Sequence, residues 1–158
     1  MRLALKKGFS FGLTSGIITT LGLMVGLFSG TASQLAVLGG ILTIAVADSM
    51  SDALGIHMSE ETTNNNHSQV WAITIATFLT KLIFSLTFVI PVLLFDLSTA
   101  IFVSIIWGLF ALIVINYKLA KSKKENPVRL ILEHLSIAVL VIIATYLIGI
   151  WISHTFKY

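Results

Sequence analysis

Two aspartates and one lysine lie inside long apolar stretches of this sequence, where an ionised side chain is costly. Asp48 and Asp52 lie in the stretch at 34–58, and Lys81 lies in the stretch at 70–95. Insertion scales assign about 2.5–3.5 kcal/mol to one Asp or Lys at the centre of a membrane-spanning helix, so such residues generally pair or bind something. These three residues are therefore the first candidates for a functional site.

The aspartates belong to a polar face. Polar positions in this stretch recur at separations of three and four, at residues 48, 51, 52, 55 and 59, which places them on one side of a helix. Two carboxylates one turn apart, with roughly 6 Å between their Cβ atoms, need a compensating metal ion, shared proton or lysine in a low-dielectric site. Oxygen ligands suit hard divalent ions, so we expect Asp48 and Asp52 to bind a metal, with neutral oxygens from Ser51 and Ser15.

Lys81 leaves three interpretations open. Counted inward along each helix from Met58 and Val70, Asp48 and Lys81 both come to lie roughly 15–17 Å deep. They could form a buried pair that fixes the packing of two helices. Alternatively, Lys81 could be a counter-charge or gate for an ion site, or it could replace the cation permanently.

The elements that must position these residues are transmembrane helices. The chain has 158 residues, 56% hydrophobic and only 11% charged, whereas soluble domains carry about 25% charged residues. Its hydrophobicity also excludes intrinsic disorder, and the absence of cysteine excludes a thiolate site. Because a spanning helix needs about 20 apolar residues, we predict an all-α polytopic membrane protein. It forms one domain over 1–158 with five spans, at about 9–28, 34–58, 70–95, 99–117 and 130–152.

The basic residues predict the orientation. Eight of the ten cations lie before the first span or after the fourth: Arg2, Lys6, Lys7, Lys118, Lys121, Lys123, Lys124 and Arg129. The positive-inside rule then predicts a cytoplasmic N-terminus and an outer C-terminus. The net charge of +3 suits anionic lipid headgroups as partners and does not indicate nucleic acid. We interpret the first span as an anchor that is not cleaved, and a compact chain without a targeting extension suits a prokaryotic plasma membrane.

Other features have weaker interpretations. The polar segment at 59–69 is expected to be a solvated connector, although Glu60, Glu61 and His67 could gather cations at an entrance. Glycines repeat every four residues in the first span, which predicts close helix packing within the bundle or at a dimer interface. Pro91 should break the third span near Thr87. No motif for an enzyme or a permanently bound cofactor is present in the sequence.

Three stretches carry recognisable motifs: the first span contains Gly12-Leu13-Thr14-Ser15-Gly16 followed by Gly22 to Leu27, the second contains Ser51 to Ser59, and the fifth ends in Ala144 to Gly149. Together they resemble the vacuolar iron transporter family of divalent-metal/proton exchangers. Gly16, Ser51 and Gly55 match the family motifs. The family's first-span aspartate falls at Ser15, its second-span methionine at Asp52 and its glutamate at Ile56, while Asp48 replaces a usual glycine. The chain is similar to a short form without the cytoplasmic metal-binding domain.

The resemblance implies a homodimer that transports iron(II) or manganese(II) as its substrate. We expect metal/proton exchange that exports the ion from the cytoplasm through a site at the dimer interface. A membrane protein that uses this fold for assembly or regulation without transport is the alternative. A transporter of another solute, with Asp48 and Lys81 as a gating pair, is a third interpretation.

Overall fold

The protein is an assembly of long helices. The computed structural model describes residues 1–63 and 66–156, and no strand occurs within those ranges. The helices are α1 (Arg2–Thr31), α2 (Gln34–Glu61), α3 (His67–Thr87), α4 (Val89–Leu94), α5 (Leu97–Lys123) and α6 (Pro127–Thr155). Taking α3 and α4 together, five helical segments are long and apolar enough to cross a membrane. The predicted all-α fold with five spans is confirmed.

Each of the five spanning segments extends beyond its predicted apolar stretch at one end or both. Helix α1 begins at Arg2 and helix α5 continues to Lys123, well into the charged flanks. Hydropathy ends a predicted segment at the first charged residue. Lys and Arg are nevertheless good helix formers, and their charged groups reach the membrane–water interface, so the helix continues through them. Capping side chains set the true starts: Ser33 Oγ accepts from the Ala36 N–H, and an Asp96 carboxylate oxygen accepts from the Thr99 N–H.

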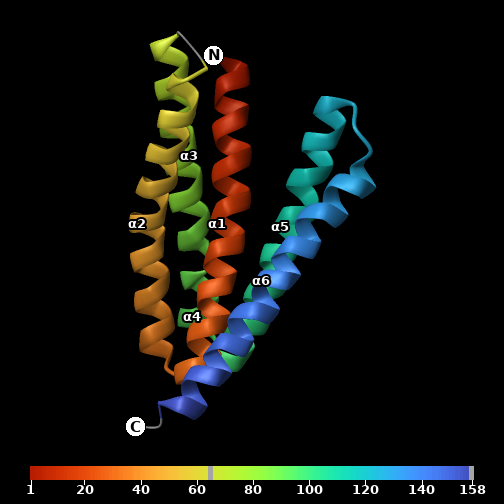
Figure 1. The fold of residues 1–158 in the computed structure, drawn as a ribbon. Coiled ribbons are helices and arrows are strands. Elements are labelled where there is room, and N and C mark those ends of the chain that lie inside the picture. The colour runs from red at the N-terminus through yellow and green to blue at the C-terminus, as the bar shows by residue number, and fades with distance from the viewer. Residues whose placement is uncertain (64–65, 157–158) are drawn as a thin grey trace.

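The third span is broken near the end of the molecule that holds the C-terminus (Figure 1), as the proline predicts. Helix α3 ends at Thr87, Phe88 forms a turn, and α4 resumes at Val89. Pro91 lacks the N–H that would bond the Thr87 carbonyl, so the helix cannot pass this point without a break.

The helices form a three-helix bundle with a diverging hairpin beside it. Helices α1, α2 and α3 run side by side, whereas α5 and α6 cross α1 near the end that holds the C-terminus and lean away towards the other end (Figure 1). That other end holds the N-terminus and the α2–α3 and α5–α6 connections, so we name it the basic end. Its cations are Lys6, Lys7, Lys118, Lys121, Lys123, Lys124 and Arg129.

The two predicted basic regions therefore share one end of the molecule. The assignment of the basic end to the cytoplasm stays a prediction. The predictions for the polar connector and for the N-terminal cations include residues 64–65 and the side chain of Arg2. These lie outside what the structure describes.

The two glycine ladders of α1 are both used within the subunit. A Cβ atom on Gly12 would lie 2.5 Å from the Thr77 carbonyl oxygen of α3, so this ladder permits close contact with α3. Gly26 and Gly30 pack in the same way on Thr145 and Gly149 of α6. Of the two interpretations of these glycines, packing within the bundle is the one that the contacts support.

An apolar core lies between Lys81 with its two aspartates and the end of the molecule that holds the C-terminus. Its largest fully buried members are Ile17, Leu21, Met24, Ile41, Phe88 and Leu112. Because α1, α2, α4, α5 and α6 all contribute buried residues to it, the core fixes the rotation of these helices and so determines which of their side chains meet in the polar part of the bundle.

Candidate functional site

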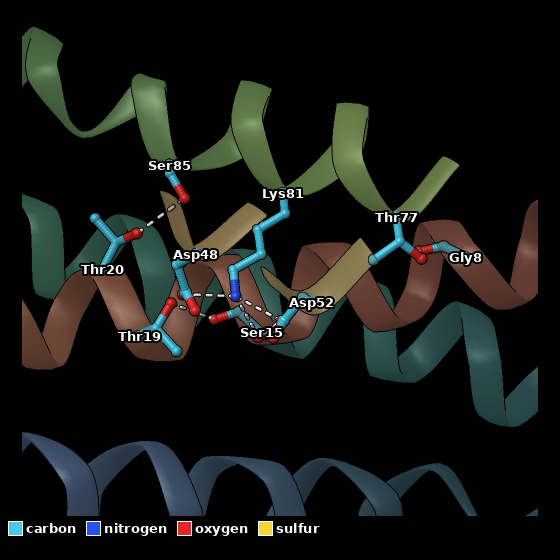
Figure 2. A network of polar contacts seen from close by, with 9 residues as sticks. All are labelled: Gly8, Ser15, Thr19, Thr20, Asp48, Asp52, Thr77, Lys81 and Ser85. Atoms are coloured by element: carbon cyan, nitrogen blue, oxygen red, sulfur yellow. Dashed lines mark hydrogen bonds and ion pairs between the residues drawn. The ribbon is translucent and has the colours of Figure 1, made fainter. Parts of the chain in front are cut away.

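Four predicted residues from three helices meet inside the bundle (Figure 2). Lys81 Nζ of α3 lies 2.6 Å from Asp48 Oδ2 and 2.5 Å from Asp52 Oδ2, both on α2. The ammonium also donates to Ser15 Oγ of α1 at 2.9 Å, and Ser15 donates to Asp52 Oδ2 at 2.6 Å. We name Ser15, Asp48, Asp52 and Lys81 the polar cluster.

The local sequence explains why Lys81 can reach this point. Thr77, Lys81 and Ser85 are spaced by four, so they lie on one face of α3, and all three are buried. That face packs on α1 where Gly16 has no side chain, since a Cβ atom there would lie 3.2 Å from Lys81 Cγ. The missing side chain gives the lysine stem its space.

Hydroxyl contacts on both sides of the cluster hold α1 against α3. Thr20 Oγ1 donates to Ser85 Oγ at 3.0 Å on one side, and Thr77 Oγ1 donates to the Gly8 carbonyl at 3.3 Å on the other. Figure 2 shows these contacts flanking Lys81 along α3. The sequence interpretation missed them, although the spacing of Thr77, Lys81 and Ser85 on the third span was a usable signal.

Exposure differs sharply between the lysine and the carboxylates. The Lys81 side chain is 1% exposed, whereas Asp48 and Asp52 are 28% and 24% exposed. Both aspartates lie at the edge of the buried face of α2, whose centre is marked by Ala45, Ser49 and Ala53. The ammonium is thus enclosed while the carboxylates stay accessible from one side.

The formal charges of the polar cluster do not cancel. Two carboxylates and one ammonium carry a formal charge of −1, so one further positive charge would neutralise the cluster. Asp48 Oδ2 is buried and accepts no hydrogen bond from the described residues, so its contact with Lys81 is an ion pair only. The arrangement can hold a cation or a proton in addition to the lysine.

Ser51 does not join the cluster. It is exposed, as are Ala47 and Gly55 one turn away on each side. Because successive residues of a helix are rotated about its axis, Asp48 and Asp52 lie on the side of α2 that contacts α1 and α3, whereas Ser51 and Gly55 lie just beyond the edge of that side. Three of the four predicted ligands therefore meet within one subunit. Among the described residues, no group of three or more His, Cys, Asp or Glu side chains could hold a metal ion.

The three residues of the predicted entrance do not gather. Glu60 is buried and forms an ion pair with Lys7 of α1. Glu61 Oε1 lies 3.3 Å from His57 Nε2, and His67 Nε2 accepts from Trp71 Nε1 at 3.0 Å. Each residue is engaged locally, at the basic end of α2 and α3: the Lys7–Glu60 pair joins two helices, and the other two contacts lie within one helix.

The VIT family model matches residues 52–150, which is more than half of the chain. The chain belongs to the VIT family. The resemblance drawn from the sequence motifs is thereby confirmed, and no curated protein matches the chain. The VIT family is a transporter family and not a family of enzymes, so membership indicates an integral membrane protein and points to metal ion transport.

The matched range has a particular relation to the polar cluster. It begins at Asp52 and includes Lys81, but Ser15 and Asp48 precede it. Two of the four members of the polar cluster therefore lie in the part of the chain that matches the family model.

Proposed function

We propose that this VIT-family protein exchanges a divalent metal, iron(II) or manganese(II), for protons and exports the metal from the cytoplasm of a prokaryote across its plasma membrane. One observation carries the proposal. Asp48, Asp52 and Ser15 converge within the membrane-spanning bundle, and both carboxylates stay partly accessible. Carboxylates inside the membrane-spanning helices of a transporter mark an ion pathway, and their oxygens suit hard divalent cations.

In this proposal, Lys81 is the counter-charge of the empty site. Its ammonium occupies the place between the two carboxylates where a bound cation would be attracted. A metal ion that binds Asp48 and Asp52 must therefore displace the ammonium from them. As the metal leaves on the far side, protons replace it on the carboxylates, so metal and protons use the same oxygens in turn.

The proposal also includes a second copy of the chain. The exposed face of α2 next to the aspartates consists of small residues: Gly39, Thr43, Ala47, Ser51 and Gly55. Nothing lies within 4 Å of a Cβ atom placed on Gly39 or Gly55, so this face is open and allows close approach of another helix. A two-fold contact here would enclose Asp48 and Asp52 and bring Ser51 towards the ion.

One observation favours the alternative function. Lys81 is fully buried and lies against both carboxylates, so it can serve as a permanent replacement for the metal. The chain would then keep the VIT fold for assembly or regulation without transport. A transporter of another solute, with Asp48 and Lys81 as its gate, uses the same pairing.

Metal uptake into proteoliposomes under a pH gradient tests these functions. We expect iron(II) or manganese(II) to move with an opposing proton flux in the wild type, and both fluxes to be lost in Asp48→Asn and in Asp52→Asn. Asp96→Asn is the matched control, because it removes the same charge from a turn outside the spans. Failure of iron, manganese, cobalt and zinc to move in folded wild-type protein would contradict the exchanger and favour the assembly function.

A further inference from the structure

A groove of about 530 Å³ opens between α1, α3 and α5 towards the basic end. It lies where α5 leans away from the three-helix bundle (Figure 1). Its walls are mainly apolar and include Phe9 and Ile115, and its size is within the roughly 300–1,000 Å³ of small-molecule sites. None of the residues that line it belongs to the polar cluster.

The polar side chains that line the groove form no ion pair or side-chain hydrogen bond with the residues that the structure describes. Lys6 and Lys118 line it from opposite helices, and neither forms an ion pair within the ranges that the structure describes. The hydroxyls of Ser10, Thr80 and Ser122 also line it and have no hydrogen bond to a described residue. Two exposed cations and three hydroxyls beside an apolar wall point to an amphipathic ligand with an anionic head that supplies acceptors.

We propose that the groove binds one anionic phospholipid of the leaflet at the basic end. Lys6 and Lys118 would contact the phosphate, the three hydroxyls would bond headgroup or ester oxygens, and an acyl chain would lie along the apolar wall. The lining residues of α5, from Ile115 to Ser122, extend over roughly 10 Å, which covers the step from headgroup to acyl chain. Basic pockets between transmembrane helices are suited to such headgroups.

Other occupants fit this groove less well. The two lysines repel a metal ion and also an identical groove on a second copy, whereas a free phosphate would leave the apolar wall unfilled. The bound lipid would connect α1 and α3 to α5 at the end where they diverge. The proposal is independent of the transport function, because it concerns binding at a separate place.

Native mass spectrometry of the full chain in a neutral detergent tests the proposal. We expect phosphatidylglycerol to bind more tightly than phosphatidylcholine with the same acyl chains, and glycerol phosphate without acyl chains not to bind. Lys6→Gln with Lys118→Gln should weaken phosphatidylglycerol binding about 30-fold, because each surface lysine contributes roughly a fivefold change in affinity. Asp48→Asn should leave the binding unchanged even if it abolishes transport.

The matched control is Lys123→Gln with Lys124→Gln, which removes the same charge from the basic end outside the groove. This control should bind phosphatidylglycerol like the wild type. Equal affinity for both lipids, or equal losses in the two double variants, would overturn the proposal in favour of a diffuse surface charge. Circular dichroism of each variant confirms that the helices are intact, so that a loss of binding reports on the groove.

Discussion

The Lys81 ammonium lies 2.6 Å from Asp48 Oδ2, and this pair joins α3 to α2 inside the membrane-spanning bundle. Because Asp52 on the next turn of α2 binds the same ammonium, the lysine fixes both the register and the rotation of the two helices. The ion pair holds the two helices together, yet its carboxylates are also the side chains that a metal ion could reach. Helix packing and the proposed metal binding therefore depend on the same carboxylate oxygens.

Replacing Lys81 tests that competition. Lys81→Met leaves two carboxylates without their cation, so we expect a loss of roughly 3–5 kcal/mol in the free energy of unfolding. Adding Asp48→Asn and Asp52→Asn to Lys81→Met should recover most of this loss, because no uncompensated charge remains. Reversible unfolding in mixed detergent measures both effects. Equal instability of the single and triple variants would show that the lost contacts of the ammonium, and not uncompensated carboxylate charge, cause the loss.

The glycine ladder on α1 predicts a contrast between two glycines. Gly12→Ala would place a Cβ atom 2.5 Å from the backbone oxygen of Thr77, which cannot move without shifting α3, so we expect a loss of about 1–3 kcal/mol. Gly55→Ala is the matched control, since its Cβ atom would meet nothing within 4 Å. Helix propensity predicts a stabilisation of up to about 1 kcal/mol there. Thermal unfolding of the two variants side by side measures the difference.

The proposed dimer predicts a different effect at the same open position. Gly55→Leu has space in a single subunit, so its stability as a monomer should be close to that of the wild type. A leucine on a face that packs closely against a second copy should separate the helices and weaken dimerisation at least tenfold. Light scattering in detergent over a range of protein concentrations measures the dissociation. An unchanged dimer would exclude this face of α2 as the interface.

Asp96 predicts a pH dependence of stability. The hydrogen bond from the Thr99 backbone N–H, together with the Thr99 hydroxyl, lowers the pKa of Asp96 below its ordinary value of 3.8. The folded state therefore favours the carboxylate, and its stabilising effect is present above pH 3.8 and is lost as the pH falls through the lowered pKa.

Asp96→Asn keeps a capping oxygen but cannot ionise, so we expect the wild type to unfold at a higher temperature than this variant near pH 6. That difference should shrink as the pH falls below 3.8 and through the lowered pKa of Asp96. Asp96→Ala removes the cap at every pH and serves as the control. A difference between wild type and Asp96→Asn that does not change with pH would contradict the role of the charge.

The number of spans and the pairing of the second span with the third could be predicted from the sequence. The first follows from the length of the apolar runs, and the second from the energetic cost of an unpaired charge in the membrane. An apolar run of about 20 residues has one stable form in a bilayer. Counting residues inward placed Asp48 and Lys81 at one depth, and their ion pair confirms that prediction. The break before Pro91 follows in the same way from the missing N–H.

Which faces meet could not be predicted in the same way. Lipid and protein are equally apolar, so hydropathy does not distinguish a packed face from a lipid-facing one. For this reason the rotation that brings Ser15 to Asp52 while turning Ser51 outward was not evident. The same reason hid the divergence of α5 and α6 from the bundle, and with it the groove that contains Lys6 and Lys118.

The two glycine ladders of α1 have a consequence for the order of assembly. One ladder needs α3 and the other needs α6, which leaves the ribosome after the rest of the described helices. The half of α1 that carries Gly22, Gly26 and Gly30 thus remains without its partner helix during most of synthesis. Long-range contacts of this kind form slowly and leave intermediates exposed. Packing of α1 is therefore completed only after the ribosome has synthesised α6.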